Sequence, residues 1–425
     1  MSQPQEGIYY RKSPPKGNSF CVLSLRSEHI AQISDLGCAM SEIWKHIENL
    51  KKGIILDLNT DRKHQKNGNL TVLVGYTSSL FGVMGTNKRI PESFGDLNFN
   101  PPKSSGGGSI IEGTGMTYSS ETVDNHLLAD HIIFQFIADT EFYTNRAAVE
   151  VWKVLHKLEK KMGKPLLRIT GLYTGFQRPD GRNWLGFHDG LSNLKSRERP
   201  HVIYINSRNL KSGESWTFNG TYMAFMRIVL DIEKWEDTDV QKQEILVGRE
   251  KLTGCPLIGV GKNGKPTKDI RCPIPGTTEV IDSGNEKFRE LPAYRFTPHD
   301  TILQHSHIAL SRPRDHVPIW DKKSLRIYRQ GFEFLVQSKG RMGFTPGLNF
   351  VSFQNTPDRF FRTLTYQQKI FQKIAVSVDT PSLDRYMAVL AAGVFFVPPI
   401  IPDAPFPGAQ IFFNDSELRK LSKIP

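Results

Sequence analysis

The feature that most constrains the fold is an order of strand-like and helix-like segments that occurs twice along the chain. Apolar residues at every second position indicate a strand, and apolar residues three to four positions apart indicate a helix. In the first half these segments are a strand at 19–25, an amphipathic stretch at 29–51, short apolar runs at 53–58 and 70–76, an apolar run at 131–138, a helix at 145–162 and a strand at 166–172. This order is strand, helix, strand, strand, helix, strand.

The second half repeats the order. Its segments are a strand at 222–231, a helix at 237–247, strands at 325–334 and 347–353, a helix at 357–374 and an apolar run at 387–397. A long loop rich in Gly, Lys and Pro is predicted over 259–285. A β-α-β-β-α-β order is that of a ferredoxin-like unit. We therefore predict an α+β fold of two ferredoxin-like units, at 1–180 and 181–425, with antiparallel sheets.

Charge and composition limit the class of partner. The chain carries a formal net charge of +12, but its Lys and Arg residues are scattered, and no zinc-finger, basic-zipper or RNA-recognition signature is present. A basic, solvated surface that attracts anionic substrates at low salt is therefore predicted, with no nucleic-acid partner. The N-terminal residues have no apolar signal core, and no run approaches the ~18 apolar residues of a membrane span. We expect a soluble, cytoplasmic protein with no membrane partner.

The four cysteines do not predict a metal site or a disulfide. Cys21, Cys38, Cys255 and Cys272 form no C-x-x-C pair and have no histidines at zinc spacing. Cys21 lies in an apolar strand-like run and Cys38 in a helical one, so both are expected to be small buried thiols.

Three segments carry residues that suit chemistry. The first is Gly186–Gly190, with the sequence GFHDG, which taken alone is an ordinary Asp-Gly turn. The second, LQHSHIALSRPRDH at 303–316, has three histidines, of which His307 could be a hydrogen-bonded core residue. In the third, SLRIYRQGFEF, Arg326 and Arg329 interrupt a strand-like run, where arginines usually face solvent.

Together and in this order, the three segments resemble the dye-decolourising (DyP-type) haem peroxidases. That family has Gly-x-x-Asp-Gly in mid-chain, then a His-Ile segment that ends in Pro-Arg, then Arg-Ile-x-Arg-x-Gly. The resemblance extends from about residue 5 to residue 375, through QEGI at 5–8, GREKLTGCPL at 248–257 and GLNFVSFQ at 347–354. Two departures lie beside the expected site: Asn193-Leu194 stands where the family usually has Asn-Pro, and Arg312-Pro313-Arg314 where it usually has Asn-Pro-Arg.

The resemblance implies a haem b site in the C-terminal half and a dimeric α+β-barrel type of fold. His307 is implied as the proximal iron ligand, with His305 and His316 as alternatives, and haem peroxidases do use such a histidine. Its second ring nitrogen needs a partner, for which Asp358, Asn355 and Gln354 are candidates. The other implied haem-contacting residues are Gly190, Leu191, Ser192, Arg312, Pro313, Arg314 and Arg326.

The implied activity is oxidation of organic donors, such as dyes and phenols, by hydrogen peroxide. Asp189 is implied as the acid-base group and Arg326 as the cation that stabilises developing negative charge. A carboxylate base predicts an acidic pH optimum. Trp184, Trp320 and Tyr328 lie near the motifs as routes for electrons, although packing is the more common role of such aromatics.

Two alternatives share these side chains: a haem-handling protein that releases iron from haem, and a haem-binding or non-haem member of the α+β-barrel group without catalysis. A homo-oligomer is compatible with the resemblance. Residues 412–425 follow a Pro-rich connector at 397–408 and are expected to extend from the folded body. Such a tail is more often a loose end, and docking inside a protein nanocompartment, as for some bacterial members, is the alternative.

Overall fold

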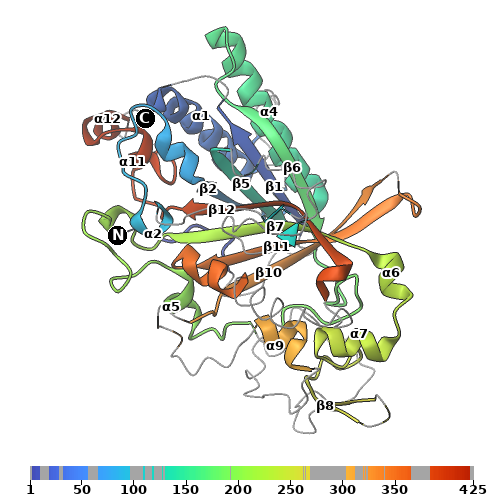
Figure 1. The fold of residues 1–425 in the computed structure, drawn as a ribbon. Helices are drawn as coiled ribbons and strands as arrows, with labels where there is room; N and C mark the ends of the chain where they lie inside the picture. Colours follow the sequence, from blue (N-terminus) through green and yellow to red (C-terminus); the bar gives the residue numbers. More distant parts are fainter. Residues whose placement is uncertain are drawn as a thin grey trace.

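The structure is a computed structural model. It describes residues 2–9, 19–27, 32–55, 66–95, 109–110, 117–118, 127, 130–191, 193–261, 263, 265–268, 303–311, 319, 321, 324–338, 340–364 and 383–421. Figure 1 shows these residues with the sequence running from blue to red.

A closed antiparallel barrel forms the centre of the described structure (Figure 1). Its strands follow one another in the order β1-β5-β2-β12-β7-β11-β10-β6. Their bounds are β1 Ser19–Arg26, β2 Thr71–Tyr76, β5 Ile132–Ala138, β6 Arg168–Phe176, β7 Thr221–Leu230, β10 Tyr328–Gln337, β11 Phe344–Gln354 and β12 Met387–Val397. Each half of the chain contributes four neighbouring strands, with the fourth strand beside the first, the first beside the third, and the third beside the second. The predicted α+β class and antiparallel pairing are confirmed, and both halves have the strand order of a ferredoxin-like unit.

Two short seams join the halves into one barrel. β2 pairs with β12 only at Tyr76 and Phe396, and β6 pairs with β10 only at Phe176 and Glu333. Buried Gln5 reinforces the first seam, because its Nε2 donates to the carbonyl oxygens of residues 74 and 398, at 3.0 and 2.8 Å. The second seam is followed directly by the chain segment 177–193, which carries the Gly-x-x-Asp-Gly motif.

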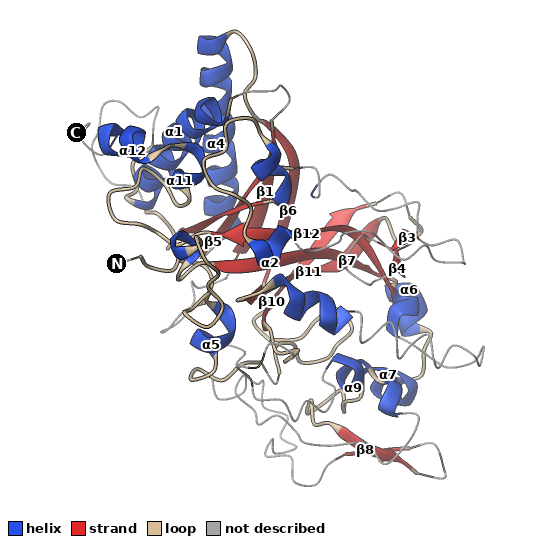
Figure 2. Ribbon diagram, turned by 60° about the vertical axis from the view of Figure 1, so that its left-hand side comes forward, coloured by secondary structure: helices blue, strands red, loops and turns tan. Residues whose placement is uncertain are grey.

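Helices cover the two halves on different sides (Figures 1 and 2). On the first half, α1 (Ile33–Lys51) and α4 (Glu141–Met162) bury an apolar stripe against β1, β2 and β5. α4 ends at Gly163, whose φ of +70° is the left-handed conformation common at helix C-termini. On the second half lie α6 (Ile232–Glu236), α7 (Val240–Val247) and α9 (His307–Ser311), while α5 (Arg199–Ile203) contacts β10 and β11.

The remaining short elements are η1 (Ser78–Gly82), α2 (Glu92–Gly95), β3 (Ser109–Ile110), β4 (Thr117–Tyr118), η2 (Ser215–Thr217), β8 (Leu257–Val260), β9 (Pro266–Lys268), η3 (Leu303–His305) and η4 (Leu383–Tyr386). β8 and β9 pair as a hairpin where the long loop at 259–285 was predicted to begin, and residues 269–285 lie outside the described residues. The helix predicted at 237–247 is preceded by the separate helix α6. The helix predicted at 357–374 is helical over 357–364, and its remainder is outside the described residues.

The C-terminal residues correct the expectation of an extended tail. α11 (Ala409–Phe412) and α12 (Asp415–Leu421) fold back onto the first half, beside α1 (Figure 2). Gly37 of α1 makes room for this contact, since a Cβ there would lie 2.6 Å from the ring of buried Phe413. Leu418 and Leu421 pack partly against the same core. Residues 409–421 therefore share a core with the first half, although the predicted boundary assigned them to the second.

The cysteines differ from expectation at two positions. Cys21 is buried and free, as predicted. Cys38 is free but exposed, because it lies on the face of α1 opposite Leu36, Ala39 and Met40. Cys255 is disulfide-bonded, so the expectation of no disulfide is wrong. None of the described helices combines the length and the apolar character that a membrane crossing requires.

The barrel interior joins the two halves through aromatic stacking, which generates a test of the fold. The ring of Phe20 lies 4.1 Å from that of Phe332, centroid to centroid, and both side chains are fully buried. We expect Phe20→Ala to lower the free energy of unfolding by about 3–5 kcal/mol, because a large cavity is left. Leu172→Ala, on the neighbouring strand and 53% exposed, is the control and should cost less than about 0.5 kcal/mol. Urea titration followed by circular dichroism measures both, and equal effects would contradict this packing.

Candidate functional site

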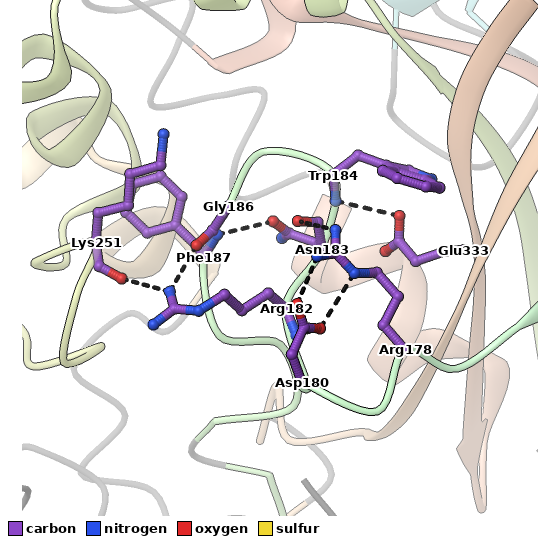
Figure 3. Close-up of polar contacts among 9 residues, drawn as sticks. All are labelled: Arg178, Asp180, Arg182, Asn183, Trp184, Gly186, Phe187, Lys251 and Glu333. Carbon is purple, nitrogen blue, oxygen red and sulfur yellow. Dashed lines mark hydrogen bonds and ion pairs between the residues drawn. The ribbon is translucent and has the colours of Figure 1, made fainter. Parts of the chain in front are cut away.

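The segment 177–191 forms a tight loop directly after β6 (Figure 3). Arg178 Nε donates to Asp180 Oδ1 at 3.1 Å, and the same oxygen accepts the backbone N–H of Arg182 at 3.1 Å. Arg182 Nη1 donates to the carbonyl oxygens of Gly186 and Lys251, each at 2.7 Å. The loop is thereby fixed both to itself and to the chain that leads into β8.

Hydrogen bonds also fasten this loop and Asn193 to strand β10. The backbone N–H of Trp184 donates to Glu333 Oε2 at 3.2 Å (Figure 3). Its indole N–H donates to the carbonyl of Phe334 at 3.0 Å. Further along, Asn193 Nδ2 donates to the carbonyl of Arg329 at 2.7 Å, and the N–H of Arg329 donates to Asn193 Oδ1 at 3.2 Å. Strand β10 is thus bound by Asn193 at Arg329 and by Trp184 at Glu333 and Phe334. These contacts fix the stretch of strand that carries the Arg329 and Glu333 side chains.

One face of β10 carries the polar groups. Successive strand residues point to opposite faces, so Arg329, Gly331 and Glu333 share a face, while Tyr328 and Phe332 join the core inside the barrel. Asp189 lies over this face: a Cβ added to Gly331 would overlap its Oδ2. The absence of a side chain at Gly331 is therefore what admits the Asp189 carboxylate.

The exposed Asp189 carboxylate is held by its own loop. The N–H of Asp189 donates to the carbonyl of Gly181 at 2.8 Å, and its Oδ1 accepts the N–H of Gly190 at 2.7 Å. Gly190 has a φ of +71°, a left-handed conformation that favours glycine and that the turn at Asp189 uses. Loop and strand together aim the carboxylate away from the protein core.

Arg329 is a cation on which the Asp189 charge acts. Its Nη2 donates to the carbonyl of Leu191 at 2.9 Å. Burial lowers the pKa of the Arg329 guanidinium, and the nearby Asp189 charge acts in the opposite sense. Within the described part of the chain, Arg329 has no carboxylate at ion-pair distance. Its positive charge is therefore available to a ligand above β10.

The charge of Arg329 also affects His307, which lies at the start of α9. Burial first, then Arg329 and Arg249, lowers the pKa of the imidazole to about 4. The ring is therefore neutral near pH 7, which is the form that binds a metal ion. Ser311 Oγ lies 3.4 Å from its Nε2.

The predicted partners of the second His307 nitrogen are engaged elsewhere. Asp358 pairs with Arg362, Asn355 Oδ1 accepts from Arg359, and Gln354 Nε2 donates to the carbonyl of Tyr222. Of the alternative ligands, His305 lies in η3 and is partly buried. His316 lies outside the described residues.

Arg326 has a different environment from the one predicted. It precedes β10, its Nη2 donates to the carbonyl of Asn193 at 3.3 Å, and it lies 4.0 Å from Glu198 Oε2. Burial lowers the pKa of Arg326, with the Glu198 charge opposing and the Arg329 charge reinforcing that shift. The structure thus brings Arg329 to Asp189, and pairs Arg326 with Glu198.

Other predicted site residues are placed as follows. Leu191 is buried and offers its carbonyl to Arg329, while Gly190 supports Asp189. Ser192, Arg312, Pro313, Arg314 and Trp320 lie outside the described residues. Tyr328 is 5% exposed, with the guanidinium of Arg199 5.3 Å from its ring centroid, so its described role is packing.

Sequence reasoning missed the roles of Arg329, Asn193 and Glu333. A signal for the first existed in the run at 325–334. If the strand begins with an inward Tyr328, then Arg329 shares its outward face with Gly331, the one position without a side chain. The sequence analysis named Asn193 only as part of a departure beside the expected site, and nothing in the sequence pattern pointed to Glu333.

The donor set fits an iron porphyrin. Among the described residues no group of three or more His, Cys, Asp and Glu side chains converges as a metal site. A porphyrin supplies four nitrogen ligands itself and needs one from the protein, and His307 provides one neutral imidazole. The guanidinium of Arg329, whose charge lowers the pKa of His307, suits an anionic ligand. Fold and site therefore define a protein of the antiparallel α+β-barrel class with a site suited to haem.

Comparison with known proteins identifies the family. The family described as Dyp-type peroxidase, C-terminal, matches residues 180–401, more than half of the chain. This chain belongs to the DyP-type peroxidase family. A solved DyP-type peroxidase from Cellulomonas bogoriensis is similar with a TM-score of 0.66 and 18% identity, over 97% of this chain and 99% of that one. Ferric DtpA from Streptomyces lividans is similar with a TM-score of 0.63 and 19% identity, over 97% and 98%.

The curated relatives are matched over a smaller share of their own length than these two structures are. Deferrochelatase from Escherichia coli strain K12 is 25% identical over 298 residues, which are 68% of this chain and 59% of that protein. Deferrochelatase from Shigella flexneri is 24% identical over the same length and shares. The match thus spans less than two thirds of these relatives.

The pairing of Asn193 with Arg329 generates a prediction. We expect Asn193→Ala to lower the free energy of unfolding by about 1–3 kcal/mol, because three side-chain hydrogen bonds are lost and partly buried backbone groups lose their partners. Asn193→Asp keeps the acceptor and loses the donor, so it should fall between the wild type and Asn193→Ala. Thermal unfolding of the haem-free protein measures this. An Asn193→Ala protein as stable as the wild type would contradict the assigned role.

Proposed function

We propose that this protein is a haem peroxidase that reduces hydrogen peroxide and oxidises small organic donors such as dyes and phenols. The observation that carries the proposal is that the partly buried Arg329 lies on the β10 face that Asp189 covers at Gly331, and that its charge lowers the pKa of His307. A peroxidase needs an imidazole on the iron, and an acid-base group with a cation on the other side. Family membership supports the same assignment.

His307 is proposed to bind the iron of haem b, as its proximal ligand. Gly190, Leu191 and Ser192 are proposed to line one haem edge. Arg312, Pro313 and Arg314 are proposed to approach the propionates, where a guanidinium fits a carboxylate with two parallel hydrogen bonds. Arg326 remains a proposed haem contact on the same side of the site.

Asp189 is proposed to accept a proton from bound peroxide and to return it to the leaving oxygen. When bound, haem would supply the iron at which peroxide is cleaved, and it would hold the two oxidising equivalents that peroxide delivers until the organic donors take them up. Arg329, in place of Arg326, is proposed to stabilise the negative charge that develops on the peroxide oxygens. A carboxylate base is ionised in weakly acidic solution, so an acidic pH optimum is part of the proposal.

The cytoplasm is the proposed location. The disulfide-bonded Cys255 is the one observation against it, because disulfides persist mainly in oxidising compartments. Fractionation of the native host, with detection of this chain in each fraction, tests the proposal. We do not extend it to nanocompartment docking, because Leu418 and Leu421 pack against the first half.

The iron ligand can be tested by binding. We expect His307→Ala to be soluble and folded but to retain little haem, because the substitution removes the imidazole proposed to bind the iron. His305→Ala, two residues away, is the matched control and should bind haem as the wild type does. The Soret absorbance per protein chain after reconstitution measures both. Full occupancy and an unchanged spectrum in His307→Ala would remove His307 as the ligand.

The two arginines can be separated by kinetics. We expect haem-loaded Arg329→Leu to react with peroxide about 10²–10³ times more slowly, the usual effect of removing one electrostatic stabiliser. Arg326→Leu should lose clearly less, because Arg326 is paired with Glu198. Stopped-flow absorbance with a peroxide series measures the second-order rate constants. The reverse order of effects would return the role to Arg326.

A second candidate function is removal of iron from haem. It is favoured by the curated relatives, which are named deferrochelatase. The two activities differ in product, since only iron removal yields metal-free porphyrin. Incubation of the haem-loaded protein with peroxide and a dye, compared with incubation without peroxide, distinguishes them. Dye oxidation with intact haem supports the peroxidase, and porphyrin fluorescence without dye turnover supports the alternative.

A further inference from the structure

Glu333 is a buried carboxyl group next to Asp189 that the proposed mechanism does not use. We propose that Glu333 is held protonated beside Asp189 and, as a positioning residue, sets the upper pH limit of the reaction by keeping Asp189 the only anion facing Arg329. The proposal rests on the peroxidase function proposed above. It concerns the regulation of that same site by pH.

The surroundings of Glu333 provide little to stabilise a negative charge. The side chain projects from β10 toward the loop at 177–191 and the residue is 4% exposed (Figure 3). Its one hydrogen bond is from the N–H of Trp184, at 3.2 Å. Its cross-strand neighbours, Phe176 on β6 and Leu348 on β11, are apolar.

The charged groups around Glu333 come from the loop and from β10 itself. Arg178 is the nearby loop cation, and it is already bound to Asp180 through its Nε and Nη2 (Figure 3). Asp180 and Asp189 bring further negative charge, and Arg329 lies four residues away on the same face of β10. No cation lies within ion-pair distance of Glu333 in the residues that the structure describes.

A carboxyl group in such a place keeps its proton. Burial first, and the Asp189 charge second, raises the pKa of Glu333 to about 8, although the Trp184 N–H and Arg178 act in the opposite direction. Two carboxyl groups that share a site rarely ionise together, and the more buried one stays neutral. Below about pH 8, Glu333 is therefore the neutral member of this pair.

The consequence for the reaction follows from the charges. With Glu333 neutral, the Arg329 guanidinium faces a single carboxylate. When Glu333 loses its proton to solvent, a second anion lies beside Asp189 and partly cancels the positive potential that Arg329 provides to bound peroxide. The rate of reaction with peroxide should therefore fall as the pH rises through the pKa of Glu333.

Glu333→Gln tests this, because the amide keeps an oxygen for the Trp184 N–H and cannot ionise. The matched control is Glu150→Gln, since Glu150 is also 4% exposed but is paired with Lys153 at 2.8 Å. The first readout uses the haem-free protein: the infrared C=O band of protonated carboxyl groups, followed from pH 6 to pH 10. We expect a component that disappears near pH 8 in the wild type and in Glu150→Gln, and that is absent from Glu333→Gln.

The second readout is the rate constant of the haem-loaded protein with peroxide between pH 6 and pH 9. For the wild type we expect a fall of up to about tenfold between pH 7 and pH 9, as for one ionising group. In Glu333→Gln this alkaline fall should be lost. An infrared band unaffected by Glu333→Gln, or an alkaline fall retained in that variant, would overturn the proposal. A wild type inert toward peroxide at every pH would instead refute the peroxidase function, while the infrared result would still report the protonation of Glu333.

Discussion

The docking of the loop at 177–193 onto strand β10 is the constraint on which the site depends. The loop carries Asp189, and the strand carries Arg329 and Glu333, so neither segment alone forms the site. Trp184 is bound near one end of the strand segment and Asn193 near the other. Because β10 also closes the barrel against β6 at a single paired position, the same strand both joins the two halves and supports the site.

Each ionisable group near the contact between the loop and β10 has one role. Burial disfavours the charged form of every ionisable group. Arg329 nevertheless remains a cation, because the ordinary pKa of a guanidinium lies far above neutral pH. The same burial keeps the His307 imidazole neutral and Glu333 protonated. Asp189 is the exposed member of this group. Burial thus separates the roles of Arg329, His307 and Glu333.

The sequence allowed much of the fold to be predicted, because hydrophobic periodicity reports directly on elements that are buried on one side. The apolar run at 387–397 coincides with β12, and the runs at 19–25 and 131–138 coincide with β1 and β5 within one residue. The apolar run at 53–58 is not a strand in its described part. There, Gly53 has a φ of +77° just after α1 ends. The tail at 412–425 was expected to extend, but its described part, 412–421, folds back, because packing against Gly37 of α1 is a long-range contact without a local signal.

For the site, motif order led to Asp189 and His307. Arg326 was predicted as the cation, and the choice of Arg329 in its place is a proposal with a physical reason. Motif spacing treats the two arginines alike, whereas the start of β10 at Tyr328 gives only Arg329 a place beside Gly331. The role of Glu333 could not be predicted from the sequence, because its unusual protonation state comes from burial and not from its residue type.

The most direct test of this account is a crystal structure of the haem-loaded protein. We expect the iron to be bound by His307 on one side of the porphyrin, with the Asp189 carboxylate and the Arg329 guanidinium facing the iron from the other side. An iron bound by a different histidine, or a site in which Arg326 faces the iron and Arg329 points away, would contradict it.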